Sequence, residues 1–421
     1  MKKDKKVSLL ENFCLKNDLI SYGVDIPFSI EGISYAHFVK SLYDYDQLSP
    51  KKVVKYPQEI VLDNKDYLQF PFYVRVRRNH HSVWKLISND GTVCLLNKNN
   101  DLCIPVRLSE YPKFYDASLK THDKEEPVTN YVHKLGSDVL SVVVNNYCSF
   151  YQEGMECHFC ELKKTYESTK LCNTPVKNLD ILAQAISIAL QMDPTIKRIA
   201  INGGNFENCN NKTIEMYIKL LEKIKKLVPE KRWEEVERWM VIMPPKNLKL
   251  LEKLKEAGAT LVLINLEIWP EDNFNYFCPG KAQYGQKEML LALKEAVKIF
   301  GIGNVLSCMI YGVQSISKDR PYIFDGNLEN KILLECLAAL AECNVIQLIN
   351  IYHETGRNKL GRIPFNAEDL LKYHIEYGKY IIKTNLIREC KRKENIIWGS
   401  LGSIPNSMNN EAAFLAFNGA I

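Results

Sequence analysis

Three cysteines in one short stretch of the chain have the type and spacing of metal ligands. Eight residues separate Cys148 from Cys157, and two separate Cys157 from Cys160. Thiolates are soft ligands that suit iron–sulfur clusters. Three of them on one loop hold three corners of a cubane cluster and leave the fourth iron free for another ligand. Gly154 allows the tight path that such a loop needs. The spacing therefore predicts a [4Fe–4S] site.

Two other interpretations of this stretch stay open. A zinc site needs four ligands, and His158 or another cysteine would have to complete it. A redox-active Cys-x-x-Cys pair leaves Cys148 without a role. The chain has 13 cysteines, and those from Cys172 onward are isolated in the sequence. Several lie singly inside apolar segments, where a buried free thiol is the default: Cys94, Cys103, Cys308, Cys336 and Cys343.

The elements that position the three cysteines belong to a strand–helix alternation that follows a linker at residues 121–127. Strands are predicted at residues 139–145, 198–202, 240–243, 260–266, 305–310, 346–351 and 395–398. Amphipathic helices are predicted between them at 178–192, 212–227, 245–257, 286–300, 327–343 and 366–384. Such alternation predicts an α/β fold with a parallel sheet, and six or seven units fit a partial (β/α)6 TIM-like barrel. Its active site is expected at the carboxyl ends of the strands.

The first part of the chain has a different pattern. Short β-like runs occur between residues 59 and 118, and Ser88–Thr92 reads as a hairpin turn. We therefore predict an N-terminal β-containing α+β accessory domain over residues 1–130 and the barrel domain over residues 131–421.

The cysteine loop resembles that of the radical S-adenosylmethionine (radical SAM) superfamily, including the aromatic residue before the last cysteine, here Phe159. The usual spacing in that family is three and then two residues, whereas here it is eight and then two. Lengthened first spacings occur in several branches, and residues 138–162 look most like a poorly characterised branch, some members of which lie near nitrilase genes. The resemblance covers about residues 135–400, and it implies a [4Fe–4S] cluster with S-adenosylmethionine as cofactors.

The resemblance also implies cofactor contacts at later strand ends. In the family a Gly-Gly-Glu stretch binds the amino group of the methionine moiety; here Gly203 and Gly204 are followed by Asn205 in place of the acid. Glu267 follows the fourth barrel strand, where a polar residue contacts the ribose or the methionyl group. Lys281, in a Cys-Pro-Gly-Lys stretch, is suited to the methionyl carboxylate. A plain turn, an exposed strand end and a surface lysine are the structural alternatives.

Further residues are predicted at the ends of the last strands. Ile310 and Tyr352 are expected to pack on the adenine, with ordinary core packing as the alternative for Ile310. Gln314 is expected to reach the substrate. His353 and Glu354 are predicted to contact the substrate or to transfer a proton, since histidine titrates near neutrality. The stretch from residue 396 to 411 resembles a pocket-closing terminal loop.

The chemistry that the resemblance implies is reductive cleavage of S-adenosylmethionine to a 5′-deoxyadenosyl radical, which abstracts hydrogen from a small molecule. The reaction class would be rearrangement, epimerisation, elimination or carbon–carbon bond formation. Flavodoxin or ferredoxin is the expected electron donor. A non-catalytic iron–sulfur or zinc nucleotide-binding sensor on the same barrel is one alternative. An RNA- or protein-modifying radical SAM enzyme is another.

Composition and charge indicate the partners and the cellular compartment expected for this protein. The net charge is +5, with lysines and arginines dispersed along the predicted helices, which gives nucleic-acid binding little support. The first residues lack the apolar core of a signal peptide, and no run approaches the length of a membrane span. We therefore expect a cytoplasmic protein with no membrane partner; the pattern says nothing of its oligomeric state.

Overall fold

The computed structural model describes residues 9–27, 30, 57, 59–63, 71–121, 124–163, 167, 176–206, 210–353, 358–361, 363–384, 386 and 407–421. Its contacts divide the chain into two compact units. Unit 1 combines Met1–Glu110 with Pro364–Ile421, and unit 2 is Tyr111–Ile363. The two units have other bounds than the two predicted domains, residues 1–130 and 131–421. The division into those domains stays a prediction.

Unit 2 is built on a sheet whose strands follow the order of the sequence. Its described strands run β15-β14-β13-β12-β11-β10-β9, and β10 to β15 are parallel. They are β9 (Val132–Leu135), β10 (Val139–Asn145), β11 (Arg198–Gly203), β12 (Glu237–Ile242), β13 (Leu261–Ile264), β14 (Val305–Tyr311) and β15 (Ile346–Ile351). The first of them, β9, pairs antiparallel with β10. The predicted α/β class and the open, six-stranded parallel core of a partial barrel are confirmed.

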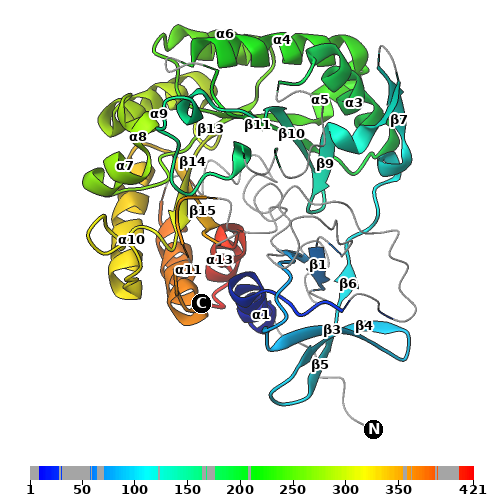
Figure 1. Cartoon of the computed structure of the whole chain (residues 1–421), viewed down its shortest axis with the longest axis vertical. Helices are drawn as coiled ribbons and strands as arrows, with labels where there is room; N and C mark the ends of the chain where they lie inside the picture. Colours follow the sequence, from blue (N-terminus) through cyan, green and yellow to red (C-terminus); the bar gives the residue numbers. More distant parts are fainter. Residues whose placement is uncertain are drawn as a thin grey trace. The chain divides into compact units, whose positions relative to one another are not determined.

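Helices cover one side of this sheet, as right-handed crossovers between parallel strands require. They are α3 (Leu179–Met192), α4 (Asn211–Leu227), α5 (Glu230–Glu235), α6 (Lys249–Glu256), α7 (Glu271–Phe277), α8 (Pro279–Ala282), α9 (Gln286–Phe300) and α10 (Gly326–Glu342). Helix α3 packs on α4, α4 on α6, and α6 on α9, so these four form a continuous outer layer (Figure 1).

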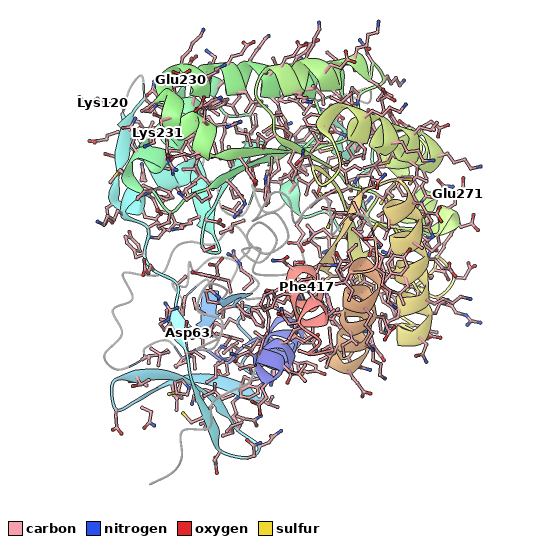
Figure 2. All side chains as sticks on the ribbon, turned by 180° about the vertical axis from the view of Figure 1, so that it is seen from behind. Asp63, Lys120, Glu230, Lys231, Glu271 and Phe417 are labelled. Atoms are coloured by element: carbon pink, nitrogen blue, oxygen red, sulfur yellow. The ribbon has the colours of Figure 1, made fainter. Side chains whose placement is uncertain are left out.

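The charged faces of these helices point away from the sheet. Glu230 and Lys231 on α5 and Glu271 on α7 are exposed and extend outward (Figure 2). The dispersed charges thus lie where water solvates them. The opposite faces supply the core: every residue of β10, β13 and β14 is buried. Among the described residues, no helix is long and apolar enough to cross a membrane.

Four short elements precede the sheet of unit 2. Strands β7 (Ser118–Lys120) and β8 (Glu125–Pro127) pair with each other, and 3₁₀ turns occur at Lys113–Asp116 and Val128–Asn130. The sequence pattern missed β9 and the short helices α5, α7 and α8, because none of them is long enough to show a clear period.

Unit 1 has two small antiparallel sheets and three helices among its described residues. The strands are β1 (Glu59–Leu62), β2 (Phe72–Arg75), β3 (Trp84–Asn89), β4 (Thr92–Asn97), β5 (Leu102–Pro105) and β6 (Arg107–Leu108). The helices are α1 (Leu9–Tyr22), α11 (Ala367–Ile381) and α13 (Asn409–Phe417). The predicted hairpin is confirmed: Asp90 and Gly91 both have positive φ between β3 and β4, as a type I′ turn requires.

Candidate cluster and cofactor site

The three cysteines lie on the loop that leaves the first parallel strand. Strand β10 ends at Asn145, and Cys148 directly precedes a 3₁₀ turn at Ser149–Tyr151. All seven residues of β10 are buried, so its apolar side chains fix where the loop starts. The carboxyl ends of parallel strands form one edge of the sheet, and this is the edge at which such folds place their ligands.

The thiols of the three cysteines share one electrostatic environment. Burial raises the pKa of Cys148, and a negative charge on Cys157 raises it further. Burial also raises the pKa of Cys160 to about 12, again with contributions from the charges on Cys157 and Cys148. The charge on Cys157 therefore raises the pKa of both other thiols, as expected when the loop brings them near one another.

The three sulfurs do not form a ligand set for a single ion. Within the described ranges, no group of three or more His, Cys, Asp or Glu side chains is arranged to hold a metal ion. In a cubane cluster each cysteine binds a different iron, so the ligands stand farther apart than around one ion. Their arrangement is that of neighbouring thiols on one loop.

The glycine pair at the end of β11 lets the backbone approach this loop. A Cβ on Gly204 would lie 2.2 Å from the carbonyl oxygen of Tyr147 and 2.7 Å from the Cβ of Cys148. The Gly204 N–H also donates to the carbonyl of Asn145 (2.9 Å), and the Asn145 amide donates to the Gly204 carbonyl (3.0 Å). Only glycine fits at this contact, which joins the ends of β10 and β11.

Asn205, the residue after the glycine pair, also contacts the cysteine loop. Its carbonyl accepts the N–H of Ser149 (2.8 Å), and its side-chain amide lies 3.1 Å from the Met243 sulfur. A backbone hydrogen bond at Asn205 also partly offsets the burial that raises the pKa of Cys148. The predicted Gly203-Gly204-Asn205 stretch therefore lies beside the first cysteine; its contact with a cofactor stays a prediction.

Glu267 and Lys281, predicted as separate cofactor contacts, form one ion pair. The Lys281 Nζ lies 2.9 Å from a Glu267 carboxylate oxygen and donates to the Asn265 carbonyl at 2.9 Å. Both side chains are mostly buried. Burial alone would lower the pKa of Lys281, but the charges of Glu267, Cys157 and Cys278 hold it above its ordinary value. The lysine therefore stays cationic beside the cysteine loop.

The segment that carries Lys281 also holds the cysteine loop in place. The N–H of His158 donates to the Phe277 carbonyl (2.8 Å), and the N–H of Gly280 donates to the Met155 carbonyl (3.0 Å). A Cβ on Gly280 would lie 2.4 Å from the Phe150 ring. Residues 277–281 and the loop therefore pack backbone against backbone.

This packing brings a fourth cysteine to the site. Cys278, at the junction of α7 and α8, is completely buried. Side-chain hydrogen bonding to Cys278 is the largest influence on Cys157 and lowers its pKa. Spacing along the sequence gives no sign of this contact, because Cys278 is isolated there. The only available signal is its place in the Cys-Pro-Gly-Lys stretch, beside Lys281.

Both polar atoms of the Gln314 side chain form hydrogen bonds that join two strand ends. Its side-chain oxygen accepts the N–H of Trp269 (2.8 Å), and its amide nitrogen donates to the carbonyls of Glu267 (2.9 Å) and Ile310 (2.7 Å). The residue is completely buried. In this structure Gln314 supports the backbone of Glu267, which has a positive φ of 68°; contact with a substrate stays a prediction. Ile310 itself is buried at the end of β14.

The remaining predicted residues lie at or near the end of β15, with one on the cysteine loop. The Tyr352 hydroxyl lies 3.0 Å from the Leu360 carbonyl and 3.1 Å from the Gly361 carbonyl. His353 is half-buried just beyond β15, and Glu354 lies outside the described residues. Phe159 is half-buried between the last two cysteines. The roles predicted for these side chains toward a cofactor or substrate stay predictions.

The region after β15 also contacts the cysteine loop. The N–H of Lys359 donates to the His158 carbonyl (2.8 Å), and its ammonium pairs with Glu156 at 2.9 Å. Burial and the charge of Lys359 lower the pKa of His158. The His158 ring packs edge-on against Tyr276 and Phe277. His158 thus has a packing role in the loop.

No protein-family model and no curated protein matches the chain. Among solved structures it is similar to HydG, a maturase of the [FeFe]-hydrogenase (18% identity, TM-score 0.40, 55% of this chain and 47% of that one). It is also similar to coproporphyrinogen III oxidase (HemN) from Escherichia coli, a radical SAM enzyme (16%, 0.34, 59% and 54%). A third is a radical SAM methyltransferase from Sphaerobacter thermophilus (12%, 0.36, 88% and 90%). The chain spans about half the length of the first two.

Proposed function

We propose that this protein is a radical SAM enzyme whose [4Fe–4S] cluster is bound by Cys148, Cys157 and Cys160. The observation that carries the proposal is the convergence of these thiols on the loop after the first parallel strand of the sheet. Their number leaves one iron of a cubane without a protein ligand, and S-adenosylmethionine would occupy that position.

The residues around the loop fit an anionic cluster. Iron–sulfur clusters take thiolates, so the ligand sulfurs must carry negative charge. Lys281 supplies a buried positive charge that favours ionisation of both Cys148 and Cys157. The half-buried positions of the three cysteines leave the loop partly open to solvent and ligands.

Several other residues are proposed to hold the cofactor and the substrate. Gly203, Gly204 and Asn205, with the Glu267–Lys281 pair, would contact the methionyl and ribose groups of S-adenosylmethionine. Ile310, Tyr352 and Phe159 would pack against it. His353 and Glu354 are the proposed substrate-facing residues, and Gln314 would act behind Glu267, whose backbone it holds. When bound, the cluster and S-adenosylmethionine would supply a 5′-deoxyadenosyl radical that takes a hydrogen atom from a small molecule. The chain's own part is to orient the two ligands and to exclude water.

Anaerobic reconstitution with iron and sulfide tests this proposal. We expect about four iron and four sulfide per chain, and 5′-deoxyadenosine on addition of dithionite and S-adenosylmethionine. Cys148→Ser, Cys157→Ser and Cys160→Ser should each lose the cluster absorbance and 5′-deoxyadenosine formation. Cys343→Ser is the matched control, because Cys343 is half-buried like the three ligands but lies at the end of α10. Retained 5′-deoxyadenosine formation in Cys148→Ser would contradict the proposal.

The buried fourth thiol favours a second candidate, a metal site closed by four cysteines. With Cys278 as a fourth ligand, an iron–sulfur cluster would have no open position, and the protein would act as a binding or sensing module. The same experiment separates the two. A closed site retains metal but releases no 5′-deoxyadenosine under reduction, and Cys278→Ala would lower its metal content.

A further inference from the structure

The cysteine loop and the segment after β15 come from strands that are far apart in the sheet. Four strands lie between β10, which the loop follows, and β15. In a flat sheet, five strand spacings of about 4.8 Å would separate these two strands by about 24 Å. Residues 358–361, here called the clasp, are nevertheless hydrogen-bonded to the loop. The loop and the clasp therefore bridge the carboxyl-end edge of an open sheet.

Two hydrogen bonds join the clasp to the loop around its last cysteine. The N–H of Lys359 donates to the carbonyl of His158 at 2.8 Å. The side-chain amide of Asn358 donates to a carboxylate oxygen of Glu161 at 3.1 Å. His158 lies two residues before Cys160, and Glu161 directly follows it. The clasp thus contacts the chain on both sides of a proposed cluster ligand.

The other side of the clasp is attached to the end of β15. Tyr352, the first residue after β15, is buried, and its N–H donates to the Tyr311 carbonyl on β14 (2.9 Å). Its hydroxyl lies 3.1 Å from the side-chain oxygen of Asn358. The same oxygen accepts the N–H of Leu360 at 3.0 Å. One side chain, that of Asn358, therefore connects β15, the clasp and the cysteine loop.

The hydrogen bonds of Asn358 determine which of its two polar atoms faces the loop. Its oxygen is used by an O–H and an N–H donor, so the amide nitrogen is left for Glu161. A carboxylate in place of this amide would have the same shape but no donor, and it would face Glu161 with like charge. The contact therefore requires an amide at this position.

We propose that Asn358 is a positioning residue for the cluster, which ties the clasp to Glu161 and so holds the backbone that carries Cys157 and Cys160. The inference rests on the proposed function. Because the clasp is attached to β15, its contacts oppose an outward movement of the loop that follows β10. The loop then keeps its thiols in place for the cluster and restricts the approach of small reagents to them.

The test uses the substitution Asn358→Asp in the full chain. It keeps the oxygen that contacts Tyr352 and Leu360 but places a carboxylate against Glu161. Glu161→Gln alone keeps an acceptor, and Asn358→Asp/Glu161→Gln restores the hydrogen bond with the donor on the loop. Asn178→Asp is the matched control, because it makes the same change at the N-cap of α3, where an aspartate accepts the same N–H groups.

Three quantities are measured without S-adenosylmethionine: the iron content after reconstitution, the rate at which a chelator removes the iron, and the rate of alkylation of each loop cysteine in the cluster-free protein. We expect Asn358→Asp to lose iron roughly 2- to 10-fold faster than the wild type, the effect of one hydrogen bond. Alkylation of Cys157 and Cys160 should accelerate by a similar factor. Glu161→Gln, the double variant and Asn178→Asp should match the wild type.

Wild-type rates in Asn358→Asp would overturn the inference. A defect in Asn358→Asp that the double variant does not reverse would also overturn it, since the change would then act on folding and not through Glu161. Failure of the proposed function looks different. The wild type itself would then form no cluster or release no 5′-deoxyadenosine, whereas the alkylation rates of the cluster-free variants would still report on the clasp.

Discussion

At Gly204 the protein has no space for even one more carbon atom. The backbone carbonyl of Tyr147 and the Cβ of Cys148 occupy the position where a side chain would begin. The family resemblance implied that the glycine pair contacts the cofactor. In the structure the close approach is to the cysteine loop itself, and this partner was not predictable because it depends on the register between β10 and β11.

Gly204→Ala should therefore disturb the first cysteine. The added Cβ would collide with fixed backbone atoms rather than with a side chain that can turn, so we expect the free energy of unfolding to fall by about 1–3 kcal/mol. Reconstituted iron content should fall with it. Chemical denaturation and an iron assay measure the two effects.

Gly361→Ala is the control for that substitution. Its added Cβ would lie 3.0 Å from the ring of Tyr322, which is 59% exposed and free to rotate away. Its stability and iron content should stay near those of the wild type. Equal behaviour of the two variants would contradict the steric explanation.

The Glu267–Lys281 pair gives a second prediction for single residues. Lys281→Met would leave the Glu267 carboxylate mostly buried without its cation, at a cost of roughly 3 kcal/mol in the free energy of unfolding. The double variant Lys281→Met/Glu267→Gln should recover part of that loss, because it removes both charges. Denaturant titrations of Lys281→Met, Glu267→Gln and the double variant form a double-mutant cycle. Additive losses would show that the two side chains do not interact.

At the scale of elements, helix α10 supports the loop that follows β14. Glu329, in the first turn of α10, accepts the N–H of Gly312 (2.6 Å) and the N–H of Ser315 (2.7 Å). Those residues flank Gln314, which in turn holds the backbone of Glu267. A buried carboxylate thus connects a helix on the outside of the sheet to the strand ends at the candidate site.

Glu329 should make stability depend on pH. Burial raises its pKa from 4.5 to about 7. Because the folded protein binds this proton more tightly than the unfolded chain, the stabilisation is complete below pH 4.5 and is lost as the pH rises to 7. The shift corresponds to about 3 kcal/mol.

Glu329→Gln provides the comparison, since it cannot ionise. Relative to this variant, the wild type should lose stability between pH 5 and pH 7.5, as measured by denaturant unfolding at each pH. A difference that does not change with pH would contradict the assignment of the titration to Glu329.

The bounds of a strand or helix were predicted correctly where its own residues define them. Strands β10 and β15 and helix α9 have the bounds expected from the sequence, because continuous apolar runs and a clear helical period define them. Strand β12 begins at Glu237 rather than at Met240. Its first residues are charged or large, and their place in the sheet depends on tertiary partners: Glu237 pairs with Arg198, and Arg238 stacks on Trp233. The predicted strand at residues 395–398 lies outside the described residues.

At the scale of the whole molecule, unit 1 joins the two ends of the described chain. Lys16 on α1 and Glu411 on α13 form an ion pair in which neither side chain is exposed. Helix α11 packs on both α1 and α13. A prediction from local sequence could not find this arrangement, because residues almost 400 positions apart must meet.

Lys16→Met should destabilise unit 1 strongly. It leaves the Glu411 carboxylate buried without a cation, and the expected loss is roughly 3–5 kcal/mol in the free energy of unfolding. Lys16→Met/Glu411→Met should be considerably more stable than the single variant. Thermal unfolding measures both.

Lys372→Met is the control for this prediction. Lys372 pairs with Glu368 on α11, but both side chains are more than half exposed, and such pairs contribute about 0–1 kcal/mol. A loss in Lys16→Met no larger than that in Lys372→Met would contradict the role given to the buried pair.

The two segments of unit 1 have a consequence for biosynthesis. Unit 2 is continuous in sequence, whereas unit 1 needs residues from both sides of it. On the ribosome, all of unit 2 is synthesised before α11 and α13, so Lys16 on α1 has no carboxylate partner until Glu411 has been added to the chain. Unit 2 is therefore expected to fold first during synthesis, and chains stalled before residue 409 would be substrates for chaperones and proteases.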